Sequence, residues 1–144
     1  TRLKSICGDL RNLRPEFTGA FHCCVSNPPY FSGGPASRTT PTARRDDSCA
    51  PAELFAAASK ALRYGGDFFL VHKPEKLAQL CACATNAGLE PKRLRLIRHR
   101  TDGPVILILL QCRKGGKPGL VWEENCLQDT DGIPTAYYRN IYHL

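Results

Sequence analysis

Strand-sized apolar segments alternate with helix-like segments along this chain. The strand candidates are residues 3–7, 21–26, 67–72, 89–100, 104–114 and 119–124, and the helix candidates are residues 51–63 and 74–87. Each helix candidate starts near a proline and is followed by glycine, which are preferred residues at these positions. Strands separated by helices predict an α/β fold whose sheet is parallel at least in part. The tail after residue 124 is expected to be irregular.

The size and composition indicate one domain without a membrane span. The chain has 144 residues, of which 42% are hydrophobic and 23% are charged, and its longest apolar run, 105–110, is only strand-sized. The first residues are polar and lack the hydrophobic segment of a secretory leader. We therefore expect a cytoplasmic protein with no membrane partner. The formal net charge of +7 makes a polyanion the first partner to consider.

The eight cysteines do not have the spacing of a zinc or redox site, because no C-x-x-C pair occurs. Most of them lie inside strand or helix candidates, namely Cys7, Cys23, Cys24, Cys81, Cys83 and Cys112. This placement predicts reduced cysteines that serve as small core residues, and no metal site.

A carboxamide, two prolines and a phenol directly follow the strand candidate 21–26. The side-chain oxygen of Asn27 and the backbone carbonyl of Pro28 are two acceptors that can bind both hydrogens of an exocyclic amine. This makes the nitrogen lone pair more available for attack, and Pro28 and Pro29 hold the turn rigid. Tyr30 and Phe31 offer aromatic surface to a planar base. Since ligands of α/β folds bind at strand carboxyl ends, the pattern favours an amine-binding site over a simple strand-ending turn.

Residues 32–49 have no periodicity and are rich in glycine, proline, serine, threonine and arginine, so we expect a long loop on the substrate side. Arg38, Arg44 and Arg45 in this loop are candidates for clamping phosphates beside a flipped base. Lys73, at the end of another strand candidate, is a candidate for the pocket rim. For a second basic cluster, within 92–100, a solvated strand face and RNA binding both remain open.

The tetrapeptide from Asn27 to Tyr30 resembles the catalytic motif of the S-adenosylmethionine-dependent amino-methyltransferases, which act on adenine N6, cytosine N4 or glutamine side chains. The wider pattern is similar to the bacterial tRNA adenine-N6-methyltransferases that modify an anticodon-loop adenine of a valine tRNA. The matching segments, which cover essentially the whole chain, are GDLRNL, SNPPYF, ARRDDSC, GGDFFLVHKPEKL, AGLEPKRLRLI and DGIPTAYYRNIYHL. The resemblance implies a Rossmann-like class I methyltransferase sheet, with residues 1–144 as the C-terminal portion of a single domain.

The resemblance also implies roles for residues of the tetrapeptide. Asn27 and Pro28 would hold the target amine, with Pro29 as part of the same rigid catalytic turn. Tyr30 would stack on the target base, and Phe31 would line the pocket. No metal is implied, because the methyl group is already activated on the sulfonium of the cofactor.

The implied cofactor contacts are fewer. Asp9 and Leu10 resemble the family positions that recognise the adenine of S-adenosylmethionine, and Asn27 would also contact the cofactor. The glycine-rich turn after the family's first strand and the acidic residue after its second strand do not occur here. In the family the sheet order is 3-2-1-4-5-7-6, so the chain is expected to be an incomplete domain that lacks the first two strands. We therefore expect it to bind S-adenosylmethionine weakly or not at all by itself.

The expected activity of the parent protein is methyl transfer to N6 of an adenine in tRNA. One alternative is a release-factor glutamine N5-methyltransferase, which shares the tetrapeptide. The other is a non-catalytic RNA-binding remnant that has kept the basic surface. A homodimer through the exposed edge of the sheet is also expected to be possible, because unpaired strand edges invite pairing.

Overall fold

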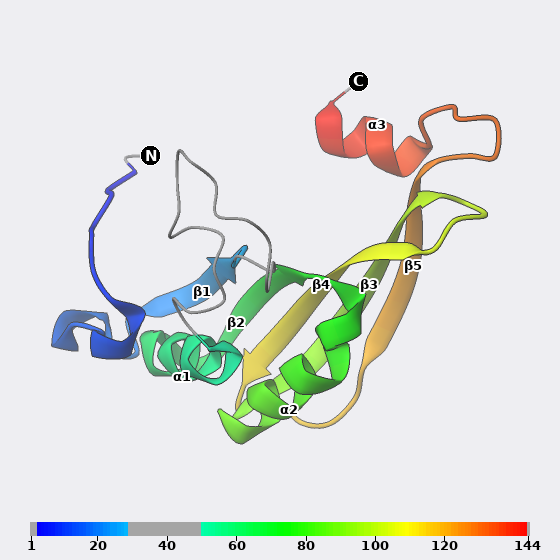
Figure 1. The fold of residues 1–144 in the computed structure, drawn as a ribbon. Coiled ribbons are helices and arrows are strands. Elements are labelled where there is room, and N and C mark those ends of the chain that lie inside the picture. The colour runs from blue at the N-terminus through cyan, green and yellow to red at the C-terminus, as the bar shows by residue number, and fades with distance from the viewer. Residues whose placement is uncertain (1–2, 29–49, 144) are drawn as a thin grey trace.

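The computed structural model describes residues 3–28 and 50–143 (Figure 1). The strands are β1 (Phe21–Ser26), β2 (Leu62–His72), β3 (Leu89–Arg100), β4 (Val105–Lys114) and β5 (Val121–Gln128). The α-helices are α1 (Pro51–Ala61), α2 (Leu77–Asn86) and α3 (Ala136–Tyr142). Three short 3-10 turns are η1 (Leu10–Asn12), η2 (Pro15–Phe17) and η4 (Pro74–Lys76).

The five strands form one mixed sheet in the order β1-β2-β4-β3-β5. β1 runs parallel to β2, and β3 runs parallel to β5, whereas β4 is antiparallel to both of its neighbours. This topology confirms the predicted α/β fold and its partly parallel sheet. β1 and β5 are the two edge strands.

One face of the sheet carries the hydrophobic core. α1 packs on β1 and β2, and α2 packs on β3, so both helices cover this face (Figure 1). Phe55 of α1 and Phe68 of β2 make an edge-to-face contact with ring centroids 5.3 Å apart. The other fully buried side chains are Leu62, Leu70, Leu80, Leu89, Ile108, Leu110 and Cys112. Because strand side chains alternate, the intervening residues of β1, β2 and β4 point away from the helices.

The first α-helix begins where proline and an acidic residue favour it. Pro51 occupies the first turn, and the carboxylate of Glu53 accepts a hydrogen bond of 2.9 Å from the N–H of Ala50. The helix ends at Ala61, two residues before the predicted end. Gly65 and Gly66 were expected to stop the helix but lie inside β2, where the register with β1 is irregular and Gly65 has a φ of 78°.

The second α-helix ends as predicted. Gly88 follows it with a φ of 73°, which is the left-handed conformation that glycine adopts at helix ends. The predicted helix start at residue 74 is a 3-10 turn that leads into α2 at Leu77.

Two sequence-based predictions were wrong. Residues 3–7 form no strand, and Leu3 is 98% exposed, because no described strand lies beside this segment to complete a ladder. The tail is not irregular, because β5 extends to Gln128 and α3 follows. The hydroxyl of Thr135 caps α3 by accepting a hydrogen bond from the N–H of Tyr138 at 3.2 Å.

The seven cysteines that the structure describes are all free thiols. Cys112 is fully buried, as expected for a core residue, whereas Cys7 and Cys23 are exposed. Within residues 3–28 and 50–143, no group of three metal-ligating side chains forms a metal site. No helix in these same ranges has the length and apolar character needed to cross a membrane.

Candidate functional site

The start of the Asn27 motif lies at the carboxyl end of two parallel strands. Asn27 follows Ser26, the last residue of β1, and Ser26 pairs with Leu70 of β2. β2 ends two residues later at His72, so Lys73 lies at the same end of the sheet. The side chain of Asn27 is exposed, and Pro28 is half-buried. This is the position in which α/β folds bind ligands.

The other predicted substrate-side residues lie outside the described residues. These are Pro29, Tyr30, Phe31, Arg38, Arg44 and Arg45. The structure therefore places Asn27, Pro28 and Lys73 at the carboxyl ends of neighbouring strands. The roles of these three residues and of the six outside the described residues stay predictions. His72 beside Lys73 is buried at 6% exposure, and its Nδ1 accepts a hydrogen bond of 2.8 Å from the N–H of Lys73.

Asp9, the predicted cofactor carboxylate, is engaged by its near neighbour Arg11. The guanidinium of Arg11 donates to both carboxylate oxygens at 2.7 to 3.1 Å, and the N–H of Arg11 donates to Oδ1 at 3.0 Å. These bonds lower the pKa of Asp9 below its ordinary value, with the side-chain bond as the main cause. Asp9 also caps η1 through this backbone contact. A ligand that uses Asp9 must therefore share or displace Arg11.

Leu10, the second predicted cofactor residue, lines a cavity of about 310 Å³ beside the free edge of β1. The cavity extends from Leu10 to Ser26, the residue immediately before Asn27. Its remaining walls are apolar side chains of α1 and the adjacent strands, including Leu54, Ala57, Ala61 and Phe68. Sequence reasoning did not identify the wall from α1, although Leu54, Ala57, Ala58 and Ala61 repeat at helical spacing.

The lining of this cavity suits only one end of S-adenosylmethionine. Its apolar wall with Leu10 suits a flat adenine ring, and Asp9, which precedes Leu10 in the sequence but does not line the cavity, is the carboxylate expected to recognise the adenine. The described residues show no comparable set of partners for the ribose and the charged amino acid end. The fit is therefore partial.

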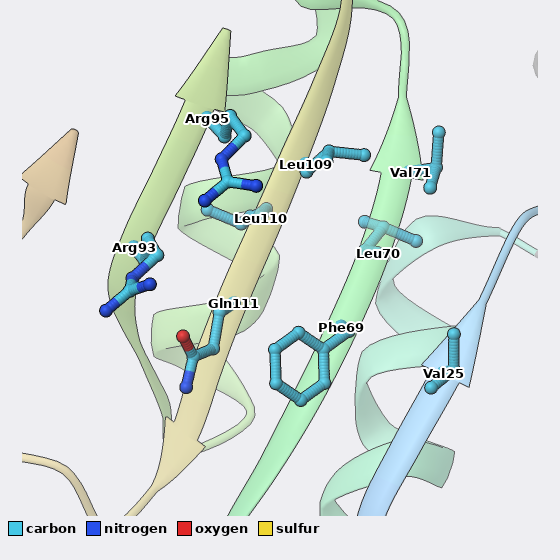
Figure 2. Close-up of a pocket in the computed structure, with 9 residues that line it drawn as sticks. All are labelled: Val25, Phe69, Leu70, Val71, Arg93, Arg95, Leu109, Leu110 and Gln111. Atoms are coloured by element: carbon cyan, nitrogen blue, oxygen red, sulfur yellow. The ribbon is translucent and has the colours of Figure 1, made fainter. Parts of the chain in front are cut away.

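A second concavity, of about 300 Å³, lies on the face of the sheet opposite the two helices (Figure 2). Val25, Phe69, Val71 and Leu109 form its apolar floor across β1, β2 and β4. Arg93, Arg95 and Gln111 lie along the side nearer β3. We call this surface the open face. Val25 is 74% exposed and Phe69 is 38% exposed.

The basic cluster of β3 is held by contacts within the chain. Arg95 donates to Glu123 of β5 at 2.7 Å and lies over the ring of Tyr137, 5.5 Å from its centroid. Arg98 donates to Glu124 and to the carbonyl of Gly103. Lys92 donates to the carbonyl of Lys117, and Arg93 forms an ion pair with Glu123. Arg100 forms an ion pair with Asp102 and donates to the carbonyl of Thr130. These contacts are those of a partly solvated strand face that pairs with β5, and RNA binding by this cluster stays a prediction.

The fold is shared with solved methyltransferase structures. Protein Atu636 of Agrobacterium tumefaciens, a predicted O-methyltransferase, matches 88% of this chain at 20% identity with a TM-score of 0.66, over 52% of its own length. TTHA0409 of Thermus thermophilus, assigned as a DNA modification methylase, matches 95% of this chain at 18% identity with a TM-score of 0.53, over 59% of its length. A further structure of TTHA0409 contains S-adenosyl-L-methionine.

Neither a family model nor a curated protein sequence matches the chain. The chain spans about half the length of the solved structures that it resembles. At this level of identity the likeness concerns the fold alone. The described sheet and its helices therefore have the α/β fold found in these methyltransferases.

Proposed function

We propose that this chain is part of an S-adenosylmethionine-dependent methyltransferase that acts on an exocyclic amine, N6 of an adenine in tRNA. The observation that carries the proposal is the position of Asn27 and Pro28, which directly follow a parallel strand of a methyltransferase-like sheet. A TTHA0409 structure with the cofactor bound shows that a protein of similar fold accommodates S-adenosylmethionine.

The proposed chemistry needs acceptors rather than a strong base. The side-chain oxygen of Asn27 and the carbonyl of Pro28 would accept the two amine hydrogens and so raise the electron density on the nitrogen. S-adenosylmethionine supplies a methyl group that is activated on a sulfonium sulfur. Transfer would form the bond between the nitrogen and the methyl carbon while the bond from that carbon to sulfur breaks, which would leave a neutral thioether, and the surplus proton of the nitrogen would pass to water. Pro29 would fix the turn, and Tyr30 and Phe31 would hold the flat base.

The tRNA part of the proposal is supported by charge in the segment after the motif. Arg38, Arg44 and Arg45 lie between the motif and α1, where arginines favour contacts with phosphates. Arg93, Arg95 and Arg98 of β3 are already paired with Glu123 and Glu124, so the proposal rests on the loop arginines. Lys73 lies at the same end of the sheet as Asn27 and is proposed to contact the substrate at the pocket rim.

The test replaces Asn27 by alanine in the gene within its own organism. We expect N6-methyladenine in purified tRNA to fall to background, as measured by mass spectrometry of the digested nucleosides. Asn86→Ala, at the exposed end of α2, is the matched control and should leave the modification unchanged. The same cells are assayed for N5-methylglutamine in release factors.

Each outcome decides between the three functions. Loss of N6-methyladenine supports the proposal, and loss of methylglutamine instead would assign the release-factor activity. If neither modification changes while the purified protein still binds tRNA, the chain is a non-catalytic RNA-binding protein and the proposal is wrong.

A further inference from the structure

The start of β5 exposes the single tryptophan of the chain. β5 is an outer strand of the sheet, and Trp122 near its beginning is 71% exposed (Figure 1). Trp122 is the register partner of Leu94 in β3, which belongs to the hydrophobic core. Because directly paired residues share a face of the sheet, the indole lies on the side that carries α1 and α2. At this exposure it is not covered by α2.

Trp122 is an isolated flat surface and not part of a broad apolar patch. Leu120 and Val121 before it are also at least half exposed. Val121 points to the other face of the sheet, however, because side chains alternate along a strand. An isolated exposed ring suits the stacking of one planar group better than the docking of a large apolar surface.

The surroundings of Trp122 carry surplus positive charge. Residues 113–122 contain one arginine, two lysines and no acidic residue. Lys92 of β3 donates to the carbonyl of Lys117 at 2.9 Å, and Lys114 donates to two carbonyls at the end of α1. A carbonyl satisfies the hydrogen bonds of an ammonium group but leaves its charge unneutralised. None of these three lysines forms an ion pair within residues 3–28 and 50–143. Glu90, near Gly116, offsets only one of their charges.

Lys92 lies close to the start of β5. It is the extra residue at the register shift between Pro91 and Arg93, and Arg93 is the register partner of Val121. Its ammonium nitrogen is bonded to the loop that leads into β5, and the side chain of Lys117 in this loop is exposed. We call the surface formed by Lys92, Lys117 and Trp122 the basic edge.

One rung of the sheet connects the basic edge with the end of β1. The register partners along this rung are Ser26 with Leu70, Leu70 with Leu110, Leu110 with Leu94, and Leu94 with Trp122. Neighbouring strands lie about 4.8 Å apart, so four strand spacings place Trp122 roughly 19 Å from Ser26. The basic edge is therefore separate from the proposed amine site, yet one folded RNA can contact both.

A second copy of the chain fits this edge less well. The N–H of Thr135 donates to the carbonyl of Leu127 at 3.0 Å, and its hydroxyl donates to the carbonyl of Cys126 at 2.6 Å. Pro134 forms an isolated bridge with Gln128. The tail thus covers the last part of the outer edge of β5. A short free segment of this kind disfavours pairing with a strand of another chain.

We infer that the basic edge binds single-stranded RNA, with a base stacked on the indole of Trp122 and phosphates in contact with Lys92 and Lys117. In a tRNA the bound segment is an unpaired loop or end. This surface is additional to Asn27 and to the loop arginines. The inference rests on the RNA part of the proposed function and needs no methyl transfer, so binding and methylation are tested separately.

The single tryptophan gives a direct readout in the 144-residue chain. The chain is titrated with a fluorescently labelled oligoadenylate of about ten nucleotides, which is within the site size of single-strand-binding surfaces. We expect the emission of Trp122 to be quenched, with the same midpoint as the anisotropy of the labelled RNA. An RNA duplex of the same length is the control and should not quench, because its bases are already stacked.

Matched variants separate stacking from charge. Trp122→Leu should weaken binding about tenfold, whereas Trp122→Phe keeps a flat ring and should retain most of the affinity. Lys117→Gln should reduce the slope of log K against log salt by about 0.7, the value for one phosphate contact on a single strand. Lys60→Gln, at an exposed position in the last turn of α1, is the charge control and should leave the slope unchanged.

Constant emission of Trp122 while the oligonucleotide binds would overturn the inference, and so would the absence of binding. Equal affinities of the parent chain and Trp122→Leu, or equal slopes for the two lysine variants, would have the same meaning. A dimer that Trp122→Leu dissociates would make a second copy the occupant. If quenching occurs but Asn27→Ala leaves tRNA methylation unchanged, the RNA surface stands and the proposed methyl transfer is wrong.

Discussion

Arg113 on β4 donates hydrogen bonds from Nε and Nη2 to the two carboxylate oxygens of Asp67 on β2, each at 2.9 Å. The two residues are directly opposed in the antiparallel register of these strands. The pair therefore locks the sheet beside the open face in one register, and its strength depends on the charge of Asp67.

This pair predicts a pH-dependent contribution to stability. The hydrogen bond from Arg113 is the main cause that lowers the pKa of Asp67 below its ordinary value of 3.8. The contribution is therefore complete above that value and is lost as the pH falls through the lowered pKa of the folded state. Asp67→Asn should lower the free energy of unfolding by about 0.5 to 1 kcal/mol at pH 7, because the pair is partly solvated. In urea titrations from pH 7 to pH 2.5, the difference from the parent chain should shrink in the most acidic samples. A difference that is constant with pH would contradict this.

The two faces of β2 should differ in their response to the same substitution. Phe68 is 1% exposed and contacts Phe55, whereas Phe69 is 38% exposed on the open face. Phe68→Ala should cost about 3 to 5 kcal/mol, because it leaves a cavity in the core. Phe69→Ala in the 144-residue chain should cost only about 1 kcal/mol, since much of its surface is already in water. Urea denaturation of both variants checks the assignment, and a larger loss for Phe69 would mean that the faces are reversed.

Local patterns in the sequence predicted most of the fold. The strands near 21–26, 89–100 and 104–114 were found to within a residue at each end, because alternation and bounding turns are local signals. The strand at 3–7 was wrong because a strand also needs a neighbour, and local sequence does not show whether one is present. The ion pair between Arg95 and Glu123 was not predicted, because it depends on β5 lying beside β3.

The candidate site was predicted in part. The position of Asn27 at a strand end follows from the prolines that stop the strand, and the structure places it there. The engagement of Asp9 by Arg11 was not predicted, because a Gly-Asp turn allows several side-chain arrangements. The open face was also missed, because its residues have the pattern of ordinary strand positions. The sequence alone does not show that α1 and α2 both pack on the opposite face of the sheet.

The partial fit of the cofactor predicts weak binding to the 144-residue chain. Asp9 is held by Arg11, and the cavity beside Leu10 accounts for only the adenine end of S-adenosylmethionine. Isothermal titration calorimetry should therefore show no binding at low micromolar concentration. Low-micromolar affinity of the 144-residue chain would show that its own residues suffice.

The loop arginines and the β3 arginines should differ in their effect on tRNA binding. Replacing Arg44 and Arg45 together by glutamine should weaken binding to all tRNAs and reduce the slope of log K against log salt by about 1.5 to 2. Arg98→Gln is the control, because Arg98 already binds Glu124 and the carbonyl of Gly103. Filter binding from about 50 mM to about 300 mM salt gives both slopes. An unchanged slope for the loop variant would count against a phosphate-binding role.

The thiols should react with alkylating reagents according to their burial. Burial raises the pKa of Cys112 to about 12, whereas Cys7 and Cys23 are exposed. Since the thiolate is the reactive form, iodoacetamide at mildly alkaline pH should modify Cys7 and Cys23 and leave Cys112 intact in the folded chain. Peptide mass mapping identifies the modified residues, and a guanidinium-unfolded sample shows that Cys112 can react once exposed. Equally fast modification of Cys112 and Cys23 without denaturant would mean that the core between the sheet and α2 opens readily.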